Sequence, residues 1–306
     1  MENVMQTSAS SLRDDVALLH GAVDIHIHHG PDLYPRIQDP IELAQDARAA
    51  GMRAVCLKRH NFPTTALAEM AHKAVPEVDV FGSLTLNREV GGLNPFAVEA
   101  AIKYGARQIW LPTIDSTNHE VVTGSVGQHG KGLTIKGGVS EYARKQPRLY
   151  LLDKDGSVLP ALKEIIQQIA DADVILNLGH TSFAEMTAVL DQARRQGVKR
   201  LICDHPFFLR LAAEQQLAIA ERGAFINFTA GELLPRWWRV SVDDFAKAIR
   251  RIGTRKAVLS SDCGQIHNPP MVEALRITCQ LMLVEGFSVD EIKLMLHHNP
   301  AELLYP

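Results

Sequence analysis

The amino-acid sequence predicts an α/β protein folded as one (β/α)8 TIM barrel. After residue 20, short apolar runs alternate with segments of helical periodicity, and eight apolar runs of this kind occur. Such alternation implies parallel strands joined by helical crossovers, and eight units suit a closed barrel. An open, doubly wound sheet is the alternative, but it normally carries a glycine-rich turn after its first strand, where this chain reads HHGPDLYP.

The expected strands are apolar and rich in β-branched residues, as strands covered on both faces should be. They span residues 22–28, 53–60, 78–87, 106–113, 173–180, 199–205, 224–229 and 256–262. Segments between them, such as IELAQDARAAG, show a 3.6-residue periodicity, and several end at a glycine, the usual residue just beyond a helix. We therefore predict a single barrel over residues 22–306, preceded by an N-terminal extension over residues 1–21.

One connection is much longer than the others. Residues 114–158 follow the fourth strand and are rich in glycine, and RLYLLDKDGSVLP within them indicates a small hairpin that turns at Asp155 and Gly156. Long irregular loops in compact domains are usually functional, so we expect this insertion to lie over the mouth of the barrel. A surface excursion without a function is the alternative.

Composition excludes several classes of protein. The chain has 306 residues, a net charge of −3 and a pI near 6.5, so it has no basic field that would attract nucleic acid or an anionic membrane. No uncharged apolar run reaches the ~18 residues that a membrane span requires. The N-terminus has no apolar signal segment, and the four cysteines form no C-x-x-C pair. These features predict a cytoplasmic protein that acts on a small molecule; a homo-oligomer is possible.

Polar side chains stand at the carboxyl ends of strands that should be almost entirely apolar. Alternate residues of a strand share a face, so Asp24, His26 and His28 are expected to point the same way, and two imidazoles so placed can chelate a metal. A single histidine at a strand end often only hydrogen-bonds a carbonyl. Five ligand-type residues at the ends of four strands, where barrel enzymes keep their chemistry, favour a site for Zn²⁺, or for Mn²⁺, Fe²⁺ or Co²⁺. The expected ligands are His26, His28, His180, His205 and Asp262.

This order of residues resembles the amidohydrolase superfamily, with H-x-H on strand one, histidines on strands five and six, and an aspartate on strand eight. The closing segment FSVDEIKLMLHHNPAELLYP, with its N-P-A-x-L-L run, is also similar to that of the superfamily. The resemblance covers residue 22 to the end. It implies a distorted barrel, one or two divalent metal ions, and hydrolysis of amide, ester or related bonds.

The resemblance also implies a role for each matching residue. His26 and His28 would bind a first metal. His180 and His205 would bind a second metal, or would divide into one ligand and one substrate contact around a single metal. Asp262 would be both a ligand and a proton shuttle.

The chain departs from the superfamily at one position. Many two-metal members carry a carbamylated lysine at the end of strand four, where this chain reads IWLPTID. The second strand instead ends in LKRH, which puts Lys58 and His60 on one face at the barrel mouth. Lys58 could be a bridging carbamate, an ammonium that binds a substrate anion, or a structural partner of Asp24 or another buried carboxylate. We favour the second reading, because a buried ammonium needs a negative partner.

The predicted function is therefore a metal-dependent hydrolase. A divalent metal would lower the pKa of a bound water, and Asp262 would accept the water proton and pass it to the leaving group, with Lys58 and His60 also in the catalytic set. His60 could alternatively be a further metal ligand. Asp24 and Asp204 are candidates to orient the imidazoles, although Asp204 is expected to face away from its neighbour His205 and to be structural. The expected substrate contacts are Lys58, Arg88, His119 and Trp237.

Two rival functions fit the same residues. One is a metal-dependent decarboxylase or other lyase on the same barrel, which a single metal and an anion-binding Lys58 would favour. The other is a barrel without catalytic activity that holds a metal or binds a small molecule. Asp262 argues against the second rival, because a purely structural zinc site is usually closed and rich in cysteine.

Overall fold

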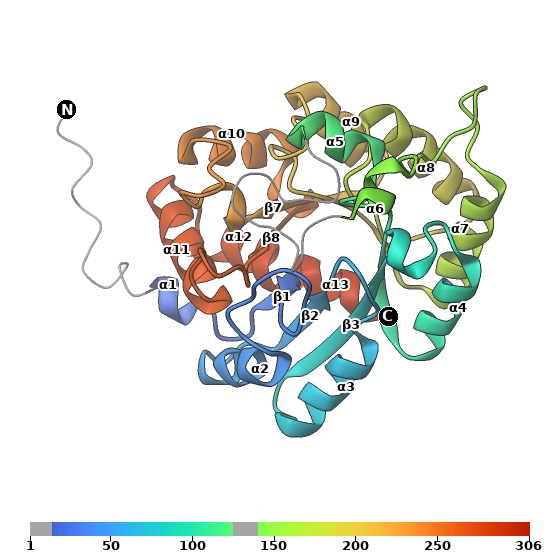
Figure 1. The fold of residues 1–306 in the computed structure, drawn as a ribbon. Helices are drawn as coiled ribbons and strands as arrows, with labels where there is room; N and C mark the ends of the chain where they lie inside the picture. Colours follow the sequence, from blue (N-terminus) through green and yellow to red (C-terminus); the bar gives the residue numbers. More distant parts are fainter. Residues whose placement is uncertain (1–13, 125–139) are drawn as a thin grey trace.

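The computed structural model describes residues 14–124 and 140–306 (Figure 1). Eight parallel strands lie in the order of the sequence, with a helix or loop between successive strands, which confirms the predicted barrel. Every strand falls within its predicted range. The strands are β1 (Val23–His28), β2 (Ala54–Lys58), β3 (Asp79–Thr85), β4 (Ala106–Trp110), β5 (Ile175–Asn177), β6 (Leu201–Asp204), β7 (Phe225–Thr229) and β8 (Ala257–Ser260).

Helices surround the strands (Figure 1). Several begin at a side-chain cap: Asp39 and Ser182 each form a capping box with a glutamate three residues later. The α-helices are α1 (Asp14–Ala17), α2 (Pro40–Ala49), α3 (Thr65–Ala74), α4 (Pro95–Lys103), α5 (Thr117–Thr123), α6 (Glu141–Lys145), α7 (Pro160–Ala172), α8 (Phe183–Arg195), α9 (Ala213–Glu221), α10 (Val242–Ile252), α11 (Met271–Val284), α12 (Val289–Lys293) and α13 (Asn299–Leu304). Short turns of tighter or wider helix complete the chain: η2 (Arg88–Val90), η3 (Ala230–Glu232), η4 (Thr254–Lys256) and η5 (Leu294–His298). None of the described helices combines the length and the apolar character needed to cross a membrane.

Strand β1 contains a register irregularity that decides which of its polar side chains face the barrel interior. Its pairing with β2 shifts register between Asp24 and Ile27. Ile25 belongs to the apolar cluster inside the barrel, whereas Ile27 belongs to the cluster between strands and helices, so the alternation of faces changes phase between them. The prediction that Asp24, His26 and His28 share one face is therefore wrong for Asp24.

The barrel closes at a seam between β1 and β8. The backbone N–H of Asp262 donates to His26 O at 2.9 Å, and that of His28 donates to Cys263 O at 2.8 Å. Asp24 contributes its carboxylate, which accepts the backbone N–H of Ser261 at 3.2 Å and that of His26 at 3.0 Å. Burial raises the pKa of Asp24 to about 6. Asp24 thus joins the first strand to the last instead of orienting an imidazole.

The insertion after β4 is described in part. Helices α5 and α6 lie within it, and an antiparallel bridge between Leu152 and Val158 forms the predicted turn around Gly156. The glycine-rich stretch at 125–139 and the first 13 residues of the N-terminal extension lie outside the described residues.

Candidate metal centre

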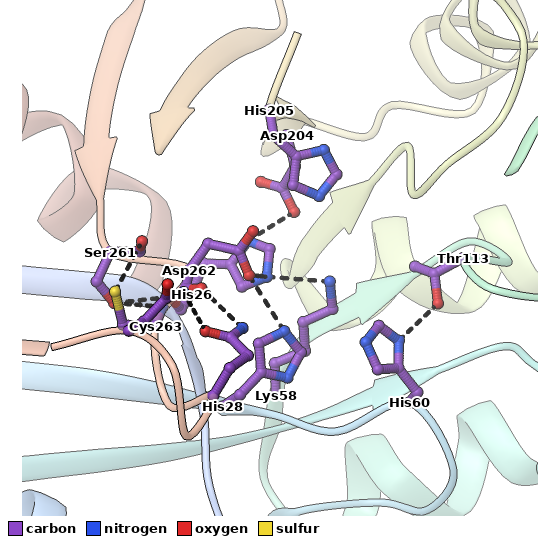
Figure 2. Close-up of polar contacts among 12 residues, drawn as sticks. His26, His28, Lys58, His60, Thr113, Asp204, His205, Ser261, Asp262 and Cys263 are labelled. Carbon is purple, nitrogen blue, oxygen red and sulfur yellow. Dashed lines mark hydrogen bonds and ion pairs between the residues drawn. The ribbon is translucent and has the colours of Figure 1, made fainter. Parts of the chain in front are cut away.

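Three predicted ligands converge beside the seam (Figure 2). Asp262 Oδ1 lies 3.2 Å from His26 Nε2 and 3.2 Å from His28 Nε2. Both histidines are at most 2% exposed, and one ligand atom from each of the three residues lies within 4.8 Å of the others. One carboxylate oxygen facing two imidazole nitrogens at this spacing matches the donor set of a divalent transition metal.

The other two predicted ligands adjoin this group. His180 Nε2 lies 3.2 Å from His205 Nε2, and a ligand atom of His205 lies within 4.8 Å of one from His26 and one from Asp204. The buried Nδ1 of His205 has no hydrogen-bond partner among the described residues. The imidazole nitrogens of His180 and His205 are buried and face each other, and a shared cation would satisfy their lone pairs. The residues present therefore fit the implied metal.

Strained backbone aims two of these side chains. His205 and Asp262 follow the ends of β6 and β8. Their backbone φ angles are +33° and +50°, values that residues other than glycine rarely adopt. Gly179, the residue before His180, also has a left-handed backbone, with a φ of +60°. A Cβ at this position would lie 2.4 Å from Leu111 O, so only glycine fits here. Such strain is typical of functional sites.

Asp204 faces the site, contrary to the expectation that it points away. The left-handed backbone at His205 breaks the alternation on which that expectation rested. Asp204 Oδ2 lies 3.1 Å from His26 Nδ1, and it accepts hydrogen bonds at 2.8 Å from Trp110 Nε1 and Asn177 Nδ2. Burial alone would raise the pKa of Asp204, but the charge of His26 holds that pKa well below its usual range. Asp204 is therefore placed to fix the ring of His26.

A different partner supports His28. Arg36 Nη2 donates to His28 Nδ1 at 3.2 Å and is itself held by Asp32, whose Oδ2 lies 2.8 Å from Arg36 Nε. Because an arginine can only donate, the proton of a neutral His28 sits on Nε2 in the metal-free site, where it faces Asp262. For this Nε2 to bind a metal, the contact between Arg36 and Nδ1 would have to give way so that the proton can move to Nδ1. Burial and the charge of Arg36 keep the pKa of His28 well below its usual value. His26 and His28 thus stand in unequal surroundings.

Lys58 and His60 also reach the site. Lys58 Nζ lies 3.0 Å from His26 Nε2 and 5.3 Å from the centre of the Trp110 ring, and burial lowers the pKa of Lys58. His60 Nδ1 lies 2.9 Å from Thr113 Oγ1, and the His60 ring lies 4.9 Å from that of His28. Both side chains therefore adjoin the predicted ligands.

A cavity of about 310 Å³ opens onto this cluster. It is lined by most of the predicted site residues, namely His28, Lys58, His60, His180, His205, Trp237 and Asp262. Further lining residues come from α5 and from the loops after β6 and β7. Two predicted substrate contacts lie elsewhere. Arg88 Nη1 lies 3.5 Å from Asp115 Oδ1, and Arg88 Nη2 donates to Gln146 O at 3.2 Å, so Arg88 connects parts of the insertion. His119 lies behind His180, with 2.8 Å between their Nδ1 atoms.

Glu232 lines the cavity and was missed by the sequence analysis. Its Oε1 accepts the backbone N–H groups of Phe207 and Phe208, each at 2.8 Å, which ties the loop after β6 to the loop after β7. Burial raises the pKa of Glu232 to about 8. Its position in the turn just beyond β7 is the signal that could have identified it, since the other site residues also follow strand ends.

Comparisons with known proteins agree with this architecture. Residues 21–227 match the model of DUF6282, which is described as a family of unknown function. No curated protein matches the chain. Among solved structures, an amidohydrolase from Pseudomonas aeruginosa is similar with a TM-score of 0.58 and 13% identity, over 96% of this chain and 97% of the other.

Two further structures are similar over nearly the whole chain. A probable dipeptidase from Pseudomonas aeruginosa has a TM-score of 0.61 and 10% identity, over 96% of this chain and 98% of the other. A putative 2-pyrone-4,6-dicarboxylic acid hydrolase from Pseudomonas putida has a TM-score of 0.58 and 14% identity, over 93% and 97%. At this level of identity the likeness shows a common fold.

Proposed function

The chain belongs to the DUF6282 family, and we propose that it is a metal-dependent hydrolase that cleaves an amide, a lactone or other ester, or a related bond of a small molecule. The observation that carries the proposal is the convergence of His26, His28 and Asp262 at 3.2 Å separations beside a cavity. Structures named as hydrolases share the barrel, which supports the same reading.

The site would hold one or two divalent metal ions, with zinc as the proposed metal. His26 and Asp262 would bind the first ion with His28, and His180 and His205 would bind a second ion or complete the first. When bound, the metal supplies Lewis-acid chemistry, which polarises the scissile bond and acidifies water.

Asp262 would carry the proton. Burial alone would raise its pKa, but the adjacent His26 and His28 hold that pKa well below its usual range, so Asp262 remains a carboxylate at neutral pH. It can therefore accept a proton from the attacking water and return it to the leaving group, a role worth roughly 10²–10⁴-fold in rate. Lys58 would turn its ammonium toward the cavity that it lines and bind a negatively charged part of the substrate.

A lyase, such as a decarboxylase, is the second candidate. Lys58 favours it, because a cation in the cavity can hold a carboxylate next to the bond that breaks. The two functions differ in the fate of water.

Reaction in ¹⁸O-labelled water separates these functions. The protein, purified without added metal, is first assayed by elemental analysis and then tested against a panel of amides, lactones, cyclic imides and carboxylic acids. A hydrolase incorporates one labelled oxygen into its product, whereas a decarboxylase releases carbon dioxide without net addition of water. A folded protein that contains no metal and takes up none from zinc buffer would exclude both metal-dependent functions.

A further inference from the structure

We propose that the cavity selects an organic anion whose charged group binds Arg239, about one ring's width from the imidazole cluster where the bond is cleaved. This inference rests on the proposed function and specifies its substrate class. It follows from the charges around the cavity and from the way Arg239 is held.

The cavity carries more positive than negative side chains. Lys58, Arg236 and Arg239 line it, opposed by the two carboxyl groups of Asp262 and Glu232. Asp262 faces its imidazole neighbours, and the Glu232 carboxylate accepts two backbone N–H groups. The raised pKa of Glu232, about 8, removes most of its charge near neutral pH and adds to the positive excess. A bound metal would add to it further, so a cavity of this composition attracts anions.

Contacts within the protein fix the position of Arg239. Its backbone N–H donates to Glu232 O at 2.9 Å, and its guanidinium lies 5.7 Å from the centre of the Phe208 ring. The backbone N–H of Phe208 in turn donates to the Glu232 carboxylate at 2.8 Å. Arg239 is an exposed residue, and it takes part in none of the ion pairs found within the described part of the chain.

Phe208 sets the spacing between the charge and the reacting bond. Its ring centre lies 5.1 Å from that of His180 and 5.2 Å from that of His205. The phenyl ring is thus a common neighbour of the guanidinium and the two imidazoles, and we infer that it separates them. A substrate with a flat body can lie along Phe208 and Trp237, with one end at the imidazoles and its anionic end at Arg239. A planar carboxylate matches the two-pronged guanidinium best.

Binding of two simple probes tests the inference without turnover. Benzoate has one carboxylate, which the imidazole cluster and its metal can take, whereas terephthalate has a second one across the ring. Dissociation constants of both are measured by calorimetry on the metal-loaded protein and on the metal-free protein. We expect terephthalate to bind the wild type roughly 10-fold more tightly than benzoate, the size of one charge-assisted hydrogen bond. Arg239→Met should abolish this preference, and Arg239→Lys should retain part of it.

Arg251→Met is the matched control, since Arg251 is an exposed arginine on α10 that does not line the cavity. It should keep the wild-type preference. If terephthalate binds the wild type no more tightly than benzoate, or if Arg239→Met keeps the full preference, the inference is wrong. Failure of the proposed function is seen separately, as a protein that takes up no metal and incorporates no labelled oxygen.

Discussion

His119 stacks on His180, and the two rings are nearly parallel, with 15° between their planes and 5.0 Å between their centres. Their Nδ1 atoms, 2.8 Å apart, share one proton, because one nitrogen must donate and the other accept. For the Nε2 of His180 to bind a metal, its proton must sit on Nδ1, with His119 as acceptor. We therefore expect His119 to be a positioning residue that acts through the ring of His180.

Replacing His119 should weaken metal binding. His119→Phe keeps an aromatic ring but has no acceptor, and we expect the dissociation constant for zinc to rise roughly 10- to 100-fold. His119→Gln keeps a carbonyl acceptor and should lose less. Titration against a chelating dye measures both variants, and circular dichroism verifies that each is folded. If the phenylalanine variant binds zinc as tightly as the wild type, His119 does not support metal binding.

The two histidines of β1 should not contribute equally. The Asp204 carboxylate contacts His26 Nδ1, which favours His26 Nε2 as a metal ligand. Arg36 contacts His28 Nδ1 instead, which keeps the His28 proton on Nε2, the nitrogen that would face a metal. We expect His26→Ala to lower zinc content more than His28→Ala, and both variants to remain folded because the barrel core is large. Elemental analysis and circular dichroism check this. A greater loss in His28→Ala would reverse the assignment.

Lys58 distinguishes a one-metal from a two-metal site. Its Nζ lies 3.0 Å from His26 Nε2, a nitrogen that cannot hold an ammonium hydrogen bond and a metal at once. With metal bound, we expect the Lys58 ammonium to bind a negatively charged group of the substrate. Lys58→Ala should then keep its full metal content, and its KM should rise by about 10- to 150-fold, or ~1.5–3 kcal/mol.

A carbamate at Lys58 predicts the opposite. Lys58→Ala would then bind half the metal of the wild type, and added bicarbonate would assist reconstitution of the wild type with metal. Metal counting alone decides between the two roles.

Glu232 should make stability depend on pH. Its pKa is about 8 in the folded protein and 4.5 when unperturbed, so between these values the unfolded chain loses a proton that the folded one keeps. The free energy of unfolding therefore falls as the pH rises from about 4.5 to 8. Glu232→Gln stays neutral and avoids this loss. In metal-free protein we expect the variant to gain roughly 1–4 kcal/mol over the wild type between pH 5 and pH 8, measured by urea unfolding at both values.

Gly264 should be required for the metal centre. Its φ is +114°, and a Cβ there would lie 1.9 Å from His28 O, so Gly264→Ala must displace the end of β1. Gly286 is a matched control, with a φ of +78° and no atom within 4 Å of its added Cβ. Gly286→Ala should cost roughly 1–2 kcal/mol through backbone strain alone and keep the metal. Gly264→Ala should cost more and also weaken zinc binding, as urea unfolding and zinc titration will measure.

The barrel could be predicted from sequence because strands covered on both faces read as apolar runs, against which polar strand-end residues stand out. The cluster around His26, His205 and Asp262 follows from that contrast. Backbone irregularities could not be predicted. The register shift after Asp24 and the left-handed φ of His205 each reverse a face assignment, and neither position carries the glycine that would announce it.

Loop residues were harder to place than strand ends. Arg88 and His119 follow strands and are polar, as substrate contacts would be, but one fastens the insertion and the other supports His180. Their sequence positions are compatible with both roles. Only the packing of the loop separates a side chain that lines the cavity, such as Trp237, from one that lies behind it.

The seam between β1 and β8 makes the proposed metal centre dependent on the completion of folding. His26 and Asp262 lie near opposite ends of the chain, and the hydrogen bond from Asp262 N to His26 O closes a loop that contains most of the barrel. Closing so long a loop carries an entropic cost that only a nearly complete barrel can offset. During synthesis, the emerging chain would hold His26 and His28 long before their carboxylate partner leaves the ribosome. High-affinity metal capture should therefore mark the finished protein, and fragments that end before residue 262 should bind zinc only as weakly as an isolated pair of imidazoles.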